Sequence, residues 1–263
     1  MNPLIDRRWH VVVPFWLLGL ALTLVYSFGA DFALADELFR LEGGSWQFRD
    51  QWLFADVFHR GGRTFSAVLA VILLVALGVA ASNKRYRHFL PGLGMTTGVI
   101  LIGLGIVNGL KAWTDGSCPW DLARYGGLLS QDAANVFNGV EGGGRCFPAG
   151  HASGGYAWLA LYFLARMYAP KWRFAGLFLG LSMGLVFGVA QQLRGAHFLS
   201  HDLWTAAICW FTAVAGFSWL ARGTMPQQAL VASAIAGDGS DTRGENSAGL
   251  DRGGQSPAGG KSV

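Results

Sequence analysis

Five long stretches of the chain carry no Asp, Glu, Lys or Arg, and they restrict the possible folds more than any other feature. A bilayer core of about 30 Å requires about 20 apolar residues in a helix. Because lipid offers the backbone no hydrogen-bond partner, each stretch is expected to be a helix that satisfies its own peptide groups. The five stretches are residues 9–30, 64–82, 92–110, 174–193 and 203–221.

A sixth stretch, residues 152–165, is shorter, but it reaches the length of a span if His151 and Arg166 lie at its two ends. Hydrophobic residues make up 52% of the chain and charged residues only 14%, whereas about a quarter of the residues in a soluble domain are charged. This composition excludes a disordered chain, a disulfide scaffold and a fibre. We therefore predict an all-α, polytopic membrane protein, a bundle of six transmembrane helices.

The charges indicate how such a bundle is oriented. The formal net charge of +4 is small for a nucleic-acid-binding protein, and the basic residues do not form the cluster that such binding requires, so we expect no nucleic-acid partner. They flank the apolar stretches instead, in groups at residues 7–8, 84–87, 166–173 and 222. With six crossings all four groups fall on one side, and the positive-inside rule then makes both termini cytoplasmic.

The chain is expected to have two parts. Residues 1–222 form the membrane domain, and its first apolar stretch lacks a cleavage site, so it is interpreted as a retained helix. Residues 223–263 are rich in Gly, Ser and Ala and are expected to form a disordered cytoplasmic tail. Residues 32–58 interleave aromatic and charged side chains, which suits either an interfacial helix pair on the outer membrane surface or an irregular loop.

A stripe of glycines marks the stretch 174–193. Gly176, Gly180, Gly184 and Gly188 follow one another at intervals of four residues. This spacing places them on one side of a helix, where small residues let another helix approach closely. The stripe predicts that this helix is central to the bundle.

Polar residues gather on the side opposite the basic groups, in residues 111–121, 145–153 and 191–202. Three of the six histidines lie in these stretches, namely His151, His197 and His201. The other three, His10, His59 and His88, are interpreted as structural.

These groups suit phosphate chemistry. Pro148 and Gly150 open a helix, whose free N–H groups form a natural anion site. Lys111 and Arg194 add positive charge, and the arginine fork matches phosphate oxygens. An imidazole held by a carboxylate is a nucleophile toward phosphorus, and a second imidazole can protonate the leaving oxygen. The set favours a phosphate ester as substrate and requires no metal or other cofactor.

From Lys111 to about Leu203 the chain resembles the type 2 phosphatidic acid phosphatase superfamily, whose motifs are K-x6-R-P, P-S-G-H and S-R-x5-H-x3-D. All three blocks occur in order, with departures. Cys118 and Gln191 occupy the two arginine positions, and Ala149 replaces the serine. Four residues after His197 stands His201, with Asp202 one residue later.

The resemblance implies roles for these residues. His197 is the expected nucleophile, oriented by Asp202, with His201 as the alternative nucleophile. His151 would protonate the leaving group. The remaining candidates would bind the phosphoryl oxygens: Lys111, Arg194 and Gly150, with Arg145 and Arg124 as substitutes for the arginine that Cys118 replaces.

Two of the three cysteines, Cys118 and Cys146, fall in loops on the outer side. If that side is periplasmic, oxidation is permitted there, and we predict a Cys118–Cys146 disulfide, with two unpaired thiols as the alternative.

The resemblance implies an integral inner-membrane phosphatase of the bacterial type. It would hydrolyse a lipid phosphate or diphosphate monoester at a periplasmic active site through a phosphohistidine. A lipid phosphotransferase would use the same site. The spacing of His197 and His201 also leaves open a histidine-ligated metalloenzyme, and a transporter or lipid-binding bundle is a further alternative. Phosphatidate, phosphatidylglycerophosphate, undecaprenyl diphosphate and lipid A all remain possible substrates, and the sequence leaves the oligomeric state open.

Overall fold

The computed structural model describes residues 4–131 and 144–244, with side chains up to residue 223. Within these residues all regular structure is helical, apart from one isolated bridge between Leu122 and Leu129. The main helices are α1 (Val13–Ser27), α2 (Ala30–Leu41), α3 (Gly62–Ser82), α4 (Leu90–Trp113), α5 (Gly150–Tyr156), α6 (Ala160–Tyr168), α7 (Arg173–Leu193) and α8 (Leu199–Gly244).

Five helical segments are long and apolar enough to cross a membrane, and each overlaps one of the five predicted stretches. They are Arg8–Ser27, Leu53–Ser82, Lys84–Trp113, Pro170–Leu193 and Leu199–Gly223. Two of them include a π-helical segment before the regular helix, Arg8–Val12 ahead of α1 and Leu53–Gly61 ahead of α3. The chain is therefore a multi-pass membrane protein.

The expected sixth span is not among these segments. Its helix consists of α5 and α6, joined by a tight 3-10 turn at Ala157–Leu159, and it carries polar groups along its length. Much of it is buried, including Ala152, Trp158 and Phe163. The count of six spans is thus not confirmed. The central helix is less apolar because its neighbours shield it, so it does not need the apolar surface of a lipid-facing helix.

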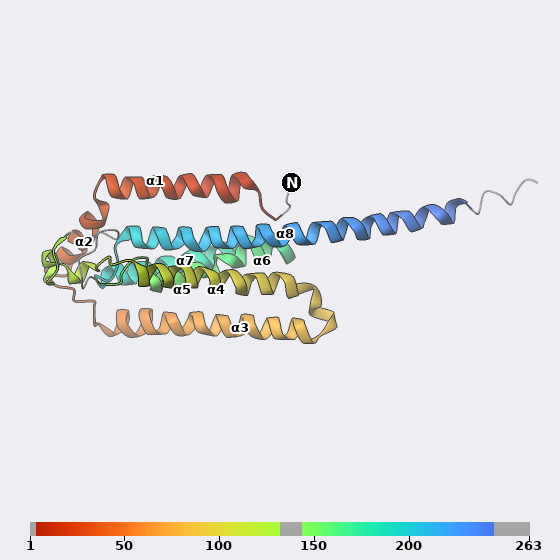
Figure 1. Ribbon diagram of the computed structural model, residues 1–263. Helices are drawn as coiled ribbons and strands as arrows, with labels where there is room; N and C mark the ends of the chain where they lie inside the picture. The colour runs from red at the N-terminus through yellow and green to blue at the C-terminus, as the bar shows by residue number, and fades with distance from the viewer. Residues whose placement is uncertain (1–3, 132–143, 245–263) are drawn as a thin grey trace, which may run out of the picture. The chain divides into compact units, whose positions relative to one another are not determined.

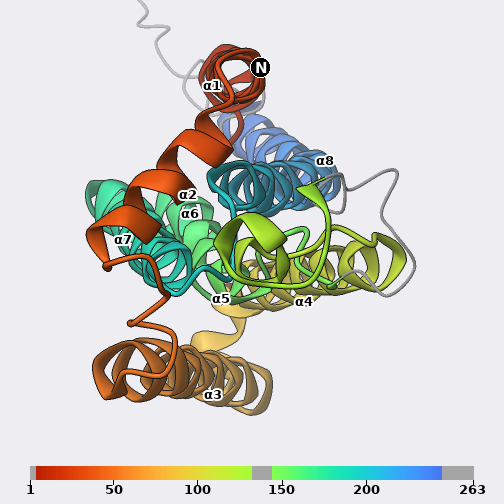
Figure 2. The same cartoon turned by 90° about the vertical axis from the view of Figure 1, so that its left-hand side faces the viewer.

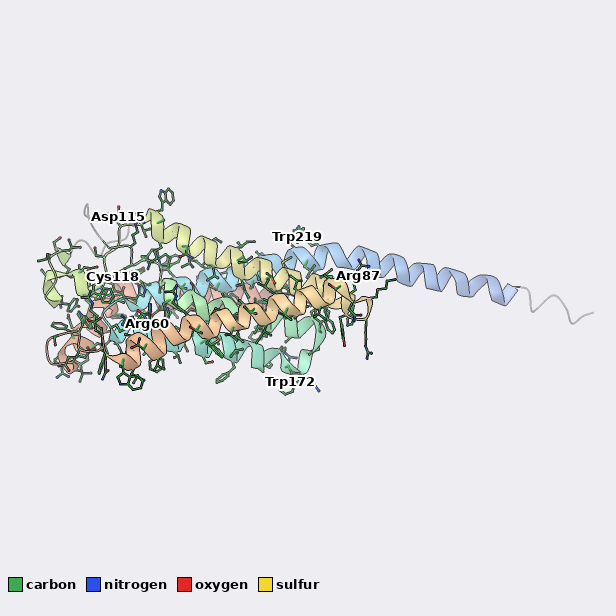
Figure 3. The ribbon with its side chains drawn as sticks, turned by 90° about the horizontal axis from the view of Figure 1, so that it is seen from below. Arg60, Arg87, Asp115, Cys118, Trp172 and Trp219 are labelled. Atoms are coloured by element: carbon green, nitrogen blue, oxygen red, sulfur yellow. A yellow bond between two sulfur atoms is a disulfide. The ribbon has the colours of Figure 1, made fainter. Side chains whose placement is uncertain are left out.

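The helices surround this central element. An end-on view shows α5 in the middle, with α1 and α3 at opposite edges of the bundle (Figure 2). Side views show the helices running alongside one another (Figure 1). Arg60, Asp115 and Cys118 lie at one end of the bundle, whereas Arg87 and Trp172 lie toward the other (Figure 3).

The glycine stripe of α7 lies where other elements approach most closely. A Cβ added at Gly176 or Gly180 would fall on the backbone of Leu161 or Leu159, and one at Gly184 would overlap the Tyr156 ring. At Gly188 it would meet the carboxylate of Asp202. The stripe therefore allows α7 to pack against α5, α6 and the start of α8 at once, and it fixes the register of the turn that follows α7.

The end of the bundle that carries Cys118 is covered by α2 and by the loop after α4. Ala35, Leu122, Tyr125 and Phe198 form a small buried cluster there. The Asp31 carboxylate accepts a hydrogen bond of 2.8 Å from the backbone N–H of Ser200, which caps the first turn of α8. Burial raises the pKa of Asp31, while hydrogen bonds from Ser200 and the neighbouring N–H oppose this rise.

The segment 32–58 combines features of both alternatives. Its first part belongs to α2, a loop follows, and Leu53–Gly61 runs directly into α3. It is therefore a single helix and a loop leading into a span, not a separate helix pair.

The chain divides into two units, Met1–Leu220 and Ala221–Val263. The structure extends α8 to Gly244, so helix occupies the first part of the segment for which the sequence predicts disorder. Residues 245–263 lie outside the described residues, and there the disordered tail stays a prediction.

Candidate active site

A cavity of about 680 Å³ lies at the end of the bundle that carries Cys118, which is one of its lining residues. Its walls come from α3, α4, α5, α7 and the loops between them. The charged and imidazole side chains among the lining residues are His59, Arg63, Lys111, Arg145, His151 and His197. The cavity thus brings together residues that are far apart in the sequence, with basic and imidazole groups and no lining carboxylate among the described residues.

His197 lies in the turn between α7 and α8 and is buried. Burial lowers its pKa well below the ordinary value, and the nearby charges of His201 and Lys111 lower it further. The ring is therefore neutral at pH 7, which is the protonation state of a nucleophile. His197 is the first predicted site residue that the structure places at the cavity.

His201 lies behind His197 and does not line the cavity. Their ring centroids are 5.7 Å apart, and the His201 ring packs edge-on against Phe147 at 5.3 Å and Phe198 at 5.5 Å. Of the two candidate nucleophiles, His197 is the one that lines the cavity.

His151 stands in the first turn of α5, and its Nε2 lies 3.2 Å from the carbonyl oxygen of Phe58. Its ring stacks on His59, with centroids 4.4 Å apart. Burial lowers the pKa of His151 to about 4, and the positive charges of His59, Arg194 and Arg63 contribute. A bound phosphate dianion would have the opposite effect, because an opposite charge favours the imidazolium.

His59, which the sequence analysis interpreted as structural, lines the cavity. The Gln191 side-chain amide lies 3.1 Å from His59 Nδ1, so Gln191, at a motif arginine position, is tied to His59. Arg63 was missed as well. The available signal is their spacing: His59 and Arg63 are four residues apart at the start of an apolar stretch, on one side of a helix.

Lys111 and Gly150 lie beside each other at the cavity, as the resemblance implies. A Cβ added at Gly150 would sit 3.5 Å from Cδ and 3.7 Å from Nζ of Lys111. Lys111 belongs to the last turn of α4, and its ammonium group lies beside the start of α5. Arg145 also lines the cavity.

Two predicted arginines do not line the cavity. Arg194 donates to the backbone oxygen of Arg49 at 2.8 Å and to Gln191 at 3.3 Å, and it is not a lining residue. Arg124 forms an ion pair with Asp36 of α2 and is not a lining residue either. Both have partners that the sequence did not reveal. Arg194 nevertheless lies near the cavity, because its partner Gln191 is a lining residue and its charge lowers the pKa of His151. The roles of both arginines in phosphate binding stay predictions.

Asp202 is buried in the first turn of α8. It accepts a hydrogen bond from the Gln192 amide and lies against Gly188. In the part of the chain that the structure describes, this carboxylate makes no hydrogen bond with the His197 ring. The predicted Asp202–His197 pair therefore stays a prediction.

Cys118 and Cys146 are joined, with Cα atoms 5.3 Å apart. The bond ties the loop after α4 to the loop that precedes α5. Together with Asp121 they form the one group of metal-ligand side chains found among the described residues. The disulfide occupies both thiols, and His197 and His201 are not part of such a group, so the geometry gives no support to the metalloenzyme alternative.

Comparison with known proteins identifies the family. The family model described as PAP2 superfamily matches residues 92–224, just over half of the chain. The chain belongs to the PAP2 superfamily. Membership of the PAP2 superfamily implies phosphatase activity on phosphate esters. No curated protein and no solved structure matches. The matched region contains every predicted PAP2 site residue, whereas His59 and Arg63 lie before it.

Proposed function

We propose that this PAP2 protein hydrolyses the phosphate or diphosphate monoester of a membrane lipid at the periplasmic side of a bacterial-type inner membrane. The observation that carries the proposal is the cavity, which joins a cationic, histidine-bearing end to walls formed by membrane helices. Lys111, His151 and His197 line it, and so do the apolar side chains of Leu104 and Phe187.

The depth of the cavity favours a lipid over a soluble ester. Leu104 precedes Lys111 by seven residues in α4, which is about 10 Å along a helix. Ser66 of α3 and Asn108 of α4 line the same cavity. A substrate that fills this space would keep its phosphate at the helix ends and its hydrocarbon between the helices.

The chemistry follows from the protonation states. A ring nitrogen of neutral His197 attacks phosphorus, and the bond from phosphorus to the leaving oxygen breaks. His151, protonated in the presence of the phosphate dianion, donates its proton to that oxygen. His151 then accepts a proton from water, which attacks the phosphohistidine and releases inorganic phosphate and neutral His197.

The cations stabilise the charge that spreads over the phosphoryl oxygens in a loose transition state. Lys111 and Arg145 line the cavity, and the Lys111 side chain lies against Gly150. We assign phosphate binding to these three residues, with Arg145 serving in the role that Cys118 lacks. Asp202 would act on His197 by orienting its ring.

The orientation rests on charge. Arg87 and Trp172 mark the end of the bundle opposite Cys118 (Figure 3), and the basic groups 84–87 and 166–173 lie in the connections there or in the helix turns beside them. The positive-inside rule then makes that end cytoplasmic and the cavity end periplasmic.

Phosphate release by the purified protein, assayed over a panel of lipid phosphates and diphosphates with a water-soluble phosphomonoester as control, tests the proposal. We expect release from lipids, and a loss of at least about 100-fold on His151→Gln, within the usual range for acid–base catalysis. His88→Gln, at the exposed opposite end, is the matched control and should be unchanged. Preference for the soluble ester would refute the lipid assignment.

The same assay separates the phosphotransferase alternative. With a labelled phosphoryl group, hydrolysis places the label in inorganic phosphate, whereas transfer places it in a second lipid. Label in a lipid acceptor, with none in phosphate, would replace hydrolysis by transfer at the same site.

A further inference from the structure

Both arginine positions of the family motif lack a cation in this chain. Cys118 holds one and is bonded to Cys146. Gln191 holds the other and is hydrogen-bonded to His59. The site therefore lacks two of the guanidinium groups that would bind the phosphoryl oxygens, and each guanidinium would offer a planar pair of hydrogen-bond donors.

One of the two gaps has a neighbour that can fill it. Arg145 directly precedes Cys146, the disulfide partner of Cys118, and lines the cavity. At Gln191 the Arg194 guanidinium is engaged by protein oxygens, because it donates to the Gln191 side chain at 3.3 Å and to the Arg49 backbone oxygen at 2.8 Å, and it is not a lining residue. A cation that lines the cavity near Gln191 therefore has to come from another helix.

Arg63 is the second residue of α3 and follows His59 by four residues in a continuous helical segment, so both side chains project from the same side. His59 contacts Gln191 and stacks on His151. Arg63 lines the same cavity, and its charge, after those of His59 and Arg194, lowers the pKa of His151.

The start of α3 is held firmly against the site. A Cβ on Gly62 would fall 2.7 Å from the Phe187 ring of α7. Three residues after Arg63, Ser66 donates to the Gly154 carbonyl of α5 at 2.9 Å and accepts from the Trp158 indole at 3.1 Å. Contacts on both sides of Arg63 therefore fix where its backbone presents the side chain.

We propose that Arg63 binds the phosphoryl group of the substrate, in place of the guanidinium that Gln191 does not provide. This inference rests on the proposed phosphatase function. It assigns to α3, outside the matched PAP2 region, a phosphate-binding residue of the active site. The occupant of this position is the transferring phosphoryl group, because Arg63 shares the cavity with both His151 and His197.

The test compares Arg63→Gln, Arg63→Lys and the control Arg60→Gln. Arg60 lies one turn earlier and forms an exposed ion pair with Asp56, so its loss should leave kcat/KM within about twofold, as for surface pairs. Arg63→Gln should lower kcat/KM by about 100-fold, the usual cost of one transition-state donor. Arg63→Lys should lie between them, because it keeps the charge and loses the fork.

A second readout needs no turnover. Orthovanadate, which mimics the transferring phosphoryl group, should raise the unfolding temperature of the wild type and of Arg60→Gln but not that of Arg63→Gln. The variant Gln191→Arg, made on Arg63→Gln, should restore both vanadate stabilisation and activity by returning a guanidinium to the motif position.

Wild-type activity and vanadate stabilisation in Arg63→Gln would overturn the inference and leave the proposed function intact. If the wild type releases no phosphate from any lipid, the proposed function fails. The vanadate comparison then still tests whether Arg63 binds a phosphoryl-like group. Should Arg63→Gln not fold, Arg63→Lys decides: kcat/KM and vanadate stabilisation both equal to wild type would overturn the inference, and a loss in both would support it.

Discussion

The imidazole of His59 stacks on that of His151, with ring centroids 4.4 Å apart and planes inclined by 27°. This contact joins the segment ahead of α3 to the first turn of α5. Because His59 also contacts Gln191 of α7, a single side chain links three elements around the cavity. The site is therefore held by a residue that lies outside the family motif.

We predict that His59 positions His151. His59→Ala should lower kcat by about tenfold, a loss typical of small shifts in a catalytic group. Since the charge of His59 lowers the pKa of His151, its removal should raise that pKa and move the corresponding limb of the pH–rate profile to higher pH. His59→Phe keeps a ring for stacking and should lose less. An unshifted pH profile in His59→Ala would contradict a positioning role.

We predict that the covalent intermediate forms on His197. Acid quenching during turnover of a labelled substrate should trap acid-labile phosphate on the wild type and none on His197→Asn. His201→Asn should still form it, since the His201 ring is enclosed by Phe147 and Phe198. Label on His197→Asn but not on His201→Asn would reverse the assignment.

Burial of neutral His151 predicts a loss of stability in acid. Its pKa falls from 6.5 to about 4, so between these values the unfolded chain binds a proton that the folded chain does not. Stability therefore rises with pH across this window and is lost as the pH falls from 6.5 toward 4.

The comparison variant is His151→Asn, whose side chain does not titrate. Its unfolding temperature in detergent should fall less than that of the wild type between pH 6.5 and pH 4. The free energy of unfolding that the wild type loses over this pH range in excess of the variant has an upper limit of about 3 kcal/mol, and solvent screening reduces it. Equal acid sensitivity of the two proteins would show that His151 is not buried in its neutral form.

Alanine substitutions are expected to have opposite effects on stability at a glycine of the α7 stripe and at a glycine of α3 outside it. Gly180→Ala places a Cβ 2.5 Å from the Leu159 backbone nitrogen, so it should destabilise the bundle by about 1–3 kcal/mol, as overpacking does. Gly78→Ala meets nothing within 4 Å and should be neutral or stabilising by about 0.5–1 kcal/mol. Thermal unfolding followed by tryptophan fluorescence measures both, and equal behaviour would mean that α7 does not pack closely there.

The disulfide predicts sensitivity to reductants. Removing the Cys118–Cys146 bond by Cys118→Ser with Cys146→Ser should cost about 2–4 kcal/mol of stability. It should also lower activity, because the bond holds the loop that carries Arg145. Cys209→Ser, at the buried free cysteine, is the control and should remain active under reductant-free conditions.

The sequence predicts the fold well where one physical constraint dominates. Length and the absence of charge locate five spans, because a lipid environment imposes both. It is less informative for the helix from Gly150 to Tyr168, which is shielded by other helices and tolerates polar residues such as Tyr156 and Tyr162. Burial by protein, unlike burial by lipid, depends on neighbours that a local pattern does not contain.

The site was predictable where residues lie in the motif. Lys111, His151 and His197 all line one cavity, as their types and order suggest. Arg194 was assigned from its charge and its place one helical turn from Gln191, and Arg124 from its charge. Each has a partner that the sequence does not reveal, the Arg49 carbonyl for Arg194 and Asp36 for Arg124. Such pairings depend on tertiary contacts, so they cannot be predicted from the order of residues in the sequence.

The hydrogen bond from the Ser200 N–H to Asp31 joins the first turn of α8 to α2. Because Ser200 follows His197 by three residues, the same bond ties the turn that carries His197 to a helix that contributes no lining residue to the cavity. Removing the Asp31 carboxylate would therefore loosen the wall of the cavity from outside it.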